Sequence, residues 1–264
     1  MIAVRLRYLM AFLAVTLAGA GPVGATTPTD DEFARLLEAG AQAERGHDPD
    51  RALEYYRRAE ALRPDDAFVL QKIAQQISDA MFLGGDAKSG RERVEEAMRY
   101  ARRAAELDPA SAVNRLSLAI LYGRLAGFGG VAEKIEYARL IRQHAEASMA
   151  LDPEYAWACH VLGRWHLEMA ALGSARRAVA AVLFGGLPSA SREEGLRLLE
   201  RAVALEPGAI AHRVELGHAY EKLGRRAEPR AQWEACLTLP VVAIYDGPAL
   251  QRARDGLDRL GARS

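Results

Sequence analysis

The chain has 264 residues, half of them hydrophobic, and its 35 lysines and arginines are balanced by 35 aspartates and glutamates. This neutral balance argues against a nucleic-acid-binding protein, which would carry a basic face. The hydrophobic fraction is large enough to bury a substantial core.

Residues 1–25 have the pattern of a secretory signal peptide. Two arginines precede the apolar stretch 8–20, and small residues lead up to Ala25, as at an A-x-A cleavage site. The apolar stretch is shorter than the roughly 20 residues of a membrane-spanning helix. We expect cleavage after Ala25 and an exported, periplasmic protein over residues 26–264. An uncleaved N-terminal membrane anchor is the alternative, and we expect no transmembrane span in the mature chain.

Five segments along the chain end alike, in a helix-like stretch followed by a proline. These prolines are Pro64, Pro109, Pro153, Pro207 and Pro240. Before Pro109, alanines stand twelve, eight and five residues upstream, at Ala97, Ala101 and Ala104. Steps of four and three place such positions on one helical face, where small side chains let the next helix approach. Proline then ends the helix, because it cannot continue one.

A helix–turn–helix unit of this kind resembles the tetratricopeptide repeat, which has about 34 residues. The resemblance implies an all-α, right-handed solenoid of about five helix pairs, with inserts between helices and a C-terminal capping helix. The expected repeats cover residues 31–64, 65–109, 110–153, 154–207 and 208–240, and the cap covers residues 246–261. All of them belong to one domain.

The middle repeats are longer than the usual unit. Successive prolines from Pro64 to Pro207 lie 44 to 54 residues apart, against 33 residues for the last pair. We expect the additional residues between the two helices of a repeat, where glycines occur at 84–85, 127–130 and 173. The inserts would then extend one rim of the solenoid.

The longest insert precedes the fourth proline. Its residues 174–184 are long enough for a short added helix. We expect Ser189 or Ser191 to cap the helix that follows, because a serine oxygen accepts a hydrogen bond from a free backbone N–H there. Glu193 and Glu194 would favour the dipole of its first turn.

Three motifs in residues 162–208 resemble the regulator of microtubule dynamics family. They are LGRW at 162–165, AAVLFGGLPSAS at 180–191 and EEGLRLLERAVALEPG at 193–208. The resemblance extends over roughly residues 30–245 and departs from the family in Gly186-Leu187-Pro188, where the family has a small residue and two prolines. It implies a repeat solenoid without catalytic residues. Some animal members tether organelles and hold phospholipid in the repeat cavity, and others associate with microtubules. For a bacterial-type exported homologue, the resemblance implies lipid or peptide binding.

Two groups of residues are candidates for ligand binding. Arg164, Arg176 and Arg177 could hold a phosphate or carboxylate through guanidinium hydrogen bonds, or they could form a solvated helix face. In the insert, Leu183 and Phe184 could wall an apolar cavity that residues 174–188 close over the concave face. The two tryptophans of this repeat are expected to pack in the core.

His160 and His166 are six residues apart, which does not match the i, i+4 spacing of helical metal ligands. His212 and His218 have the same spacing. We therefore expect no metal site, and we expect the histidines to lie on the surface or in the groove, where His160 is a further candidate for ligand binding. Cys159 and Cys236 could form a disulfide in an oxidising compartment, but free, buried cysteines fit their apolar surroundings better.

No catalytic motif of the serine hydrolase, zinc protease or P-loop type occurs in the chain. We therefore expect a protein that is not an enzyme and needs no cofactor. Its concave face is expected to bind a protein or peptide partner in the cell envelope. The alternative is a carrier of phospholipid or another apolar ligand, with a cavity closed by residues 174–188.

Overall fold

The computed structural model of the chain describes residues 28–81, 87–225 and 227–262. The signal peptide expected at residues 1–25 lies outside these ranges. Within them the chain forms helices and no strands, which confirms the all-α class. The helices are α1 (Pro28–Arg45), α2 (Pro49–Leu62), α3 (Ala67–Ala80), α4 (Ala87–Leu107), α5 (Ala112–Phe128), α6 (Val131–Leu151), α7 (Ala156–Ala170), α8 (Ser174–Phe184), α9 (Arg192–Leu205), α10 (Ile210–Lys222), α11 (Ala227–Cys236) and α12 (Asp246–Gly261).

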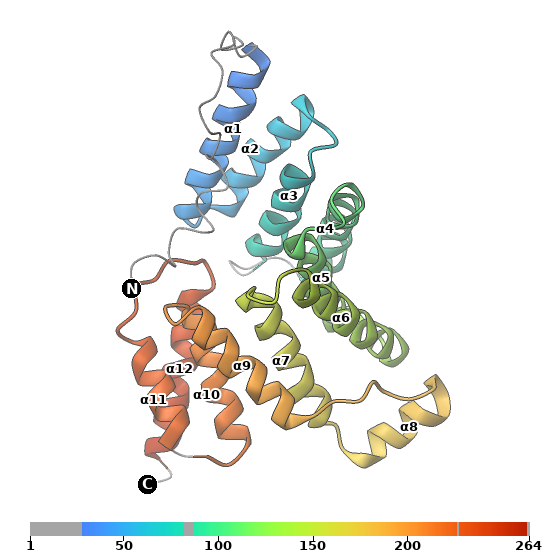
Figure 1. Cartoon of the computed structure of the whole chain (residues 1–264), viewed down its shortest axis with the longest axis vertical. Helices are drawn as coiled ribbons and strands as arrows, with labels where there is room; N and C mark the ends of the chain where they lie inside the picture. Colours follow the sequence, from blue (N-terminus) through green and yellow to red (C-terminus); the bar gives the residue numbers. More distant parts are fainter. Residues whose placement is uncertain (1–27, 82–86, 226, 263–264) are drawn as a thin grey trace, which may run out of the picture.

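The helices pair along the chain as a repeat solenoid requires. The pairs are α1 with α2, α3 with α4, α5 with α6, α7 with α9, and α10 with α11, while α12 packs on α10 and α11 as a cap. Successive pairs stack into a curved array from α1 to α12 (Figure 1). Helix α8 stands outside the pairing and contacts α6. A helical-repeat solenoid with a capping helix is therefore confirmed.

Capping residues set the start of several helices. Asp66 and Ser111 each accept a hydrogen bond from the backbone N–H three residues ahead, at the starts of α3 and α5. Ser191 does the same for α9, with 3.1 Å between its hydroxyl oxygen and the nitrogen of Glu194. These bonds satisfy N–H groups that have no partner within the helix. Of the two serines predicted to cap α9, Ser191 is confirmed and Ser189 is not.

The additional residues of the middle repeats lie partly elsewhere than expected. The second helices α4 and α6 have 21 residues each, and only residues 129–130 connect α5 to α6. Gly127 and Phe128 continue α5 instead of forming a loop. Longer helices thus take up much of the extra length, because neither stretch contains a proline that would end them. Residues 84–85 lie outside the described ranges. In the fourth repeat, α8 is an added helix over the residues expected for it.

Small residues allow close helix packing where the sequence predicts it. Ala97, Ala101 and Ala104 on α4 are completely buried. Between α7 and α9, a Cβ atom at Gly195 would lie only 2.9 Å from the carbonyl oxygen of Gly163. The backbones of these two helices therefore touch without side chains between them.

This contact predicts opposite effects for two glycine-to-alanine substitutions in helices. Alanine normally stabilises a helix interior by about 0.5–1 kcal/mol relative to glycine. Gly195→Ala should nevertheless lower the free energy of unfolding by about 1–3 kcal/mol, because a rigid backbone oxygen blocks the new methyl group. Gly127→Ala, with no atom within 4 Å of its Cβ position, should raise it. Urea unfolding of both variants checks this, and a stabilised Gly195→Ala would contradict the close approach.

Two further features of the described ranges bear on function. None of their helices combines the length and apolarity needed to cross a bilayer. Cys159 on α7 and Cys236 at the end of α11 are both buried and free, as the sequence predicts. Burial raises the pKa of both thiols, which makes them poor nucleophiles near neutral pH.

Candidate binding groove on the concave face

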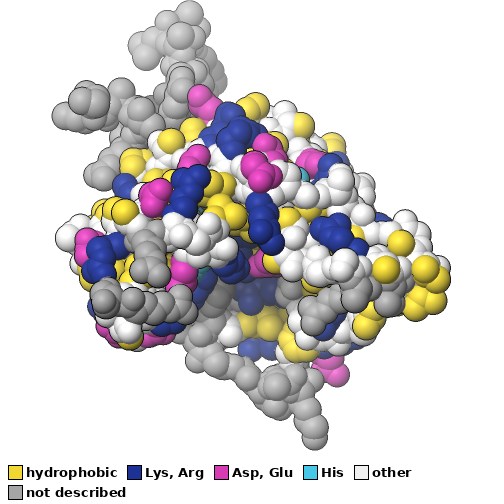
Figure 2. Space-filling model, turned by 90° about the horizontal axis from the view of Figure 1, so that it is seen from below, with side chains coloured by type: hydrophobic (Ala, Val, Ile, Leu, Met, Phe, Trp, Pro, Cys, Tyr) yellow, Lys and Arg dark blue, Asp and Glu magenta, His cyan; other side chains and the backbone are white. Residues whose placement is uncertain are grey.

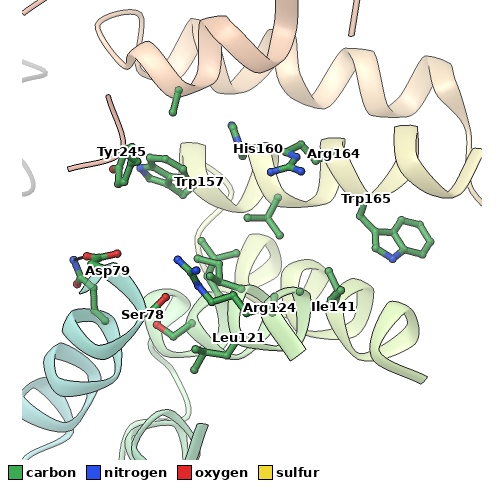
Figure 3. Close-up of a pocket in the computed structure, with 18 of the residues that line it drawn as sticks. Ser78, Asp79, Leu121, Arg124, Ile141, Trp157, His160, Arg164, Trp165 and Tyr245 are labelled. Atoms are coloured by element: carbon green, nitrogen blue, oxygen red, sulfur yellow. Dashed lines mark hydrogen bonds between the residues drawn. The ribbon is translucent and has the colours of Figure 1, made fainter. Parts of the chain in front are cut away.

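The concave side of the solenoid holds a cavity of about 620 Å³. Its walls come mainly from the first helix of each of four repeats, α3, α5, α7 and α10, and from the start of α12, and Ile141 of α6 also lines it (Figure 3). Side chains from these helices point into the space between them (Figure 3). A volume of this size lies within the range of about 300–1,000 Å³ typical of ligand sites.

One wall of the groove is a row of polar side chains on α3. Gln71, Gln75 and Asp79 recur every four residues and all line the cavity. The amide nitrogen of Gln71 lies 3.5 Å from Gln75 Oε1, and that of Gln75 lies 3.3 Å from Asp79 Oδ2. Both distances exceed the usual 2.9–3.0 Å. These groups are therefore held in a row by weak mutual bonds.

The remaining surface of the groove is largely apolar and aromatic. Val113 and Ile120 of α5 line it and stay partly exposed. Across from them, the ring of Trp157 packs against Tyr245 at a centroid distance of 5.2 Å, in an edge-to-face geometry. Trp165 also borders the groove but is buried, and its indole nitrogen donates to the carbonyl of Ala138 at 2.7 Å. Core packing is thus confirmed for Trp165, whereas Trp157 faces the groove.

The charged side chains at the α7–α10–α12 end of the groove neutralise one another. Glu215 is 6 % exposed and lies between two arginines, 3.5 Å from Arg164 Nε and 3.0 Å from Arg252 Nη2. Arg164 also reaches Glu168 at 2.8 Å. Burial raises the pKa of Glu215, but the two guanidinium groups outweigh it, so the net pKa lies below the usual value. Glu215 thus stays ionised near neutral pH and links the three helices.

The chain curls far enough for its C-terminal part to approach α3. Tyr245, just before α12, is close enough to Asp79 for that carboxylate to help raise its pKa, although burial is the larger cause. Burial also raises the pKa of Asp79 to about 6. Figure 3 shows the two side chains at the same end of the groove, Tyr245 on the upper wall and Asp79 on the lower one. Residues far apart in the chain therefore approach each other across this end of the groove.

A buried histidine pair supports Trp157 from behind. Nδ1 of His160 lies 3.0 Å from Nδ1 of His212, so one ring donates and the other accepts. Nε2 of His212 lies 3.4 Å from a carboxylate oxygen of Glu206. Burial holds the pKa of His160 well below its usual value, and the charges of His212 and Arg164 lower it further. The pair fixes the Trp157 ring between α7 and α10.

Comparison with known proteins identifies the family. The family model for regulator of microtubule dynamics proteins 1–3 matches residues 35–261, most of the chain. The chain belongs to this family.

Animal proteins of this family are among its curated relatives. The chain is 28 % identical to regulator of microtubule dynamics protein 3 of Xenopus laevis over 225 residues, which cover 84 % of this chain and 49 % of the relative. It is 31 % identical to protein 1 of Bos taurus over 161 residues, which cover 60 % of this chain and 51 % of the relative. The chain therefore spans about half the length of the curated relatives it matches.

Solved structures support the fold alone. A thermophilic tetratricopeptide-repeat protein of Thermus thermophilus superposes with a TM-score of 0.63 at 20 % identity, over 85 % of this chain and 98 % of that one. PilF of Pseudomonas aeruginosa gives a TM-score of 0.55 at 12 % identity, over 89 % of this chain and 91 % of that one. The tetratricopeptide-repeat assignment of this family member is thus confirmed.

The residues that the sequence suggested for ligand binding lie in different parts of the structure. His160 and Arg164 line the groove. Arg177 instead donates to the carbonyls of Met169 and Leu172, at the end of α7. Leu183 is 65 % exposed on α8. The side chains of Arg176 and Phe184 lie outside the described part of the structure. Arg164 pairs with Glu168 and Glu215 in the groove, whereas Arg177 bonds carbonyls outside the groove lining, so the described contacts give no support to anion binding by these two arginines together. Ligand binding by the remaining residues stays a prediction.

The expectation that residues 174–188 close the cavity is wrong. None of the described residues that line the groove belongs to this insert, and α8 projects from the end of α7 away from the curved array (Figure 1). Hydrogen bonds at the two ends of the insert explain why α8 points away from the groove. Arg177 caps the last carbonyls of α7, and Arg139 of α6 donates to the carbonyl of Gly186 at 2.9 Å. These bonds hold the insert outward.

We expected the histidines on the surface or in the groove, and this expectation is wrong in part. His160, His166 and His212 are buried, and Nδ1 of His166 accepts a hydrogen bond from the backbone N–H of Ser191 at 3.2 Å. It therefore positions the start of α9. Within the three described ranges, no cluster of three or more histidine, cysteine or acidic side chains is placed to hold a metal ion.

Sequence reasoning missed most of the groove. The missed polar residues include Gln71, Gln75, Asp79, Arg124, Glu215, Tyr245 and Arg252. One local signal was present, because Gln71, Gln75 and Asp79 lie at i, i+4 spacing on a helix whose other residues are mostly apolar. A polar row on such a helix indicates a functional face.

The titration of the histidines predicts that stability falls as the solution is acidified. Burial is the first cause of the lowered pKa values of His144, His160, His166 and His218. Below about pH 6.5, the unfolded chain binds protons at these positions more readily than the folded chain, so the free energy of unfolding decreases. Asp79 acts in the opposite sense, because its folded pKa of about 6 is raised.

With four histidines against the carboxyl groups of Asp79 and Glu60, whose pKa burial also raises, we expect a net loss of about 1–3 kcal/mol between about pH 7 and pH 5. Urea unfolding at the two pH values measures it. Asp79→Asn should make the loss larger, because it removes a group that gains protons on folding. Constant or rising stability on acidification would contradict the burial of these histidines as neutral rings.

Proposed function

We propose that this protein is a non-catalytic scaffold of the cell envelope, and that its concave groove binds an extended segment of a partner protein. The tetratricopeptide fold and the family membership support a protein-interaction role. The observation that carries the proposal is the row of Gln71, Gln75 and Asp79 along one wall of the groove.

The spacing of this row matches an extended peptide backbone. Residues four apart on a helix are separated by about 6 Å along its axis. Every second residue of an extended chain repeats after about 6.5 Å. A side-chain amide offers both a donor and an acceptor, so Gln71 and Gln75 can each bond one peptide unit of a strand laid along α3. Their bonds to each other and to Asp79, and that of Gln71 to the hydroxyl of Ser117 at 3.4 Å, are all longer than usual, which leaves hydrogen-bonding capacity to a ligand.

The opposite wall supplies the apolar contacts for the side chains of such a segment. Val113, Ile120 and Trp157 line the groove together. Alternate side chains of an extended peptide point to opposite sides, so one set can face these residues. The ion pairs of Glu215 with Arg164 and Arg252 compensate each other's charge, which favours a segment of low net charge.

A phospholipid or apolar-ligand carrier is the weaker candidate. An acyl chain along α3 would remove the amides of Gln71 and Gln75 from water without offering hydrogen bonds, which is unfavourable. This function also needed residues 174–188 as a lid, and none of the described residues of that insert lines the groove. Native mass spectrometry of the purified protein tests it directly, since a bound phospholipid would add its mass to that of the chain.

Peptide selection followed by calorimetry tests the proposed function. Peptides selected from a random library on the intact protein should bind the groove, and the Gln71→Ala/Gln75→Ala double variant should weaken them about tenfold. Gln251→Ala is the matched control, because Gln251 bonds Asp255 at i+4 on the exposed surface of α12. Equal loss in both variants, or no loss in either, would contradict the proposal.

The envelope location rests on the signal-peptide pattern of residues 1–25. Expression of the full chain in a Gram-negative host should yield a periplasmic protein. Its mass under denaturing conditions should match that of residues 26–264. A full-length mass in the membrane fraction would instead indicate the N-terminal anchor, and a full-length mass in the cytoplasm would contradict export.

A further inference from the structure

Carboxylates gather at the end of the groove where α3 meets the start of α12. On the face that Figure 2 shows, basic and acidic side chains are interspersed. Tyr245 lies in a different environment. Burial is the first cause of the raised pKa of its hydroxyl, and the carboxylates of Asp79, Asp246 and Glu206 raise that pKa further. The strongest charge effects on this tyrosine therefore all come from acidic side chains.

Of these three carboxylates, Asp79 has the fewest interactions. Asp246 accepts two backbone N–H bonds, at 2.8 and 2.9 Å. Glu206 lies 3.4 Å from a ring nitrogen of a buried histidine. Asp79 accepts one long bond, from Gln75 at 3.3 Å, and within the described ranges it forms no ion pair. It is also the member of the three that lines the groove.

The cations nearby compensate the charge of Asp79 only in part. Lys72 of the same helix pairs with Glu44 at 2.8 Å. Burial raises the pKa of Asp79 to about 6, and the bond from Gln75 and the charge of Arg124 are too weak to offset it. A carboxylate that has lost water without gaining a close partner is unfavourable. A cation brought by a ligand would supply the missing interaction.

Aromatic rings surround the position that such a cation would occupy. Tyr155, Trp157 and Tyr245 line the groove together with Asp79, and all three rings are half-buried. Figure 3 shows Trp157 and Tyr245 next to each other, across the groove from Asp79. The faces of aromatic rings attract ammonium and guanidinium groups. A carboxylate on one wall and aromatic rings on the other are thus suited to a basic side chain.

We propose that this end of the groove binds the cationic side chain of a lysine or arginine in the bound segment. The inference rests on the proposed function, because the cation belongs to the peptide that lies along α3. Asp79 is one helical turn beyond Gln75, so the basic residue lies at the end of the segment that passes this turn. Its charged group faces Asp79, and its alkyl stem packs against Trp157.

The sequences and affinities of selected peptides test this inference. Peptides selected from a random library on the intact protein should share a lysine or arginine at one position. Synthetic peptides with lysine or norleucine at that position differ in charge but keep an alkyl chain. We expect the norleucine peptide to bind about tenfold more weakly in calorimetry. Asp79→Asn should weaken the lysine peptide to the same extent and leave the norleucine peptide unchanged.

Asp255→Asn is the matched control for the loss of a carboxylate. Asp255 also accepts a bond from a glutamine four residues earlier, Gln251, at 2.8 Å, but it lies on the exposed surface of α12. This variant should bind the lysine peptide as the unsubstituted chain does. Circular dichroism establishes that both variants are folded.

Two results would overturn the inference while leaving the proposed function intact. The first is a set of groove-binding peptides that depend on Gln71 and Gln75 but share no basic residue. The second is an equal loss of the lysine and norleucine peptides in Asp79→Asn, because Asp79 would then not recognise the charge. If no selected peptide depends on the two glutamines, the proposed function fails, and this inference fails with it.

Discussion

Trp233→Ala should lower the free energy of unfolding by about 3–5 kcal/mol, the usual cost of truncating a buried tryptophan. Trp233 on α11 is completely buried, and its indole nitrogen donates to the carbonyl of Val214 at 3.2 Å. The ring fills the space between Gly217 of α10 and Gly256 of α12, both of which would clash with it if they carried a Cβ. The side chain therefore joins the last repeat to the cap. Chemical denaturation measures the loss.

The glycine beside Trp233 provides the control through a double-mutant cycle. A Cβ at Gly217 would meet the indole nitrogen, so Gly217→Ala alone should be destabilising by about 1–3 kcal/mol. In the Trp233→Ala background the same change should be neutral or stabilising, because the space is empty and alanine favours helix. Additive losses, or a Trp233→Ala cost below about 1 kcal/mol, would show that the ring does not form this interlock.

Trp157→Ala should weaken a groove-selected peptide about 30-fold, which corresponds to about 2 kcal/mol of binding free energy. Trp157 is half-buried at the groove wall and packs on His212 and Tyr245, with ring centroids 4.6 and 5.2 Å away. A rigid aromatic ring held from behind is the type of residue that dominates recognition surfaces. Calorimetry with the selected peptide measures the change.

Phe68→Ala is the control for the loss of an aromatic ring. Phe68 lies on α3 and is 53 % exposed, outside the groove lining. It should leave peptide affinity unchanged. If Trp157→Ala binds as tightly as the unsubstituted chain while remaining folded, the peptide does not contact this wall, and the proposed orientation along α3 is wrong.

The repeat pattern predicted the fold because its signals are local. Small residues at fixed steps before a proline determine both the face of a helix and its end, so α2, α4, α6 and α9 follow directly from the sequence. The added helix over residues 174–184 is visible for the same reason. The length of α4 and α6 was harder to predict from the sequence. Glycines at 127–130 suggested a long loop, but the chain remains helical up to Phe128.

The groove could not be predicted in the same way, because it is formed by residues far apart in the chain. Asp79 and Tyr245 come together only through the accumulated curvature of the repeats. The direction in which α8 projects could not be predicted from the sequence either. An apolar insert beside a concave face suggests a lid, but the bonds of Arg177 and Arg139 to backbone carbonyls, which direct it outward, have no sequence signature.

Crosslink mapping tests the central claim, binding in the concave groove, most directly. A selected peptide with a benzophenone at its centre would be irradiated on the intact protein, and the linked residues identified by mass spectrometry. We predict crosslinks to the groove-facing residues of α3, α5 and α7, such as Gln75, Ile120 and Trp157, that the unlabelled peptide prevents. Crosslinks confined to α4, to α8 or to residues of α6 other than Ile141, which lines the groove, would contradict the proposal that the concave face is the binding face.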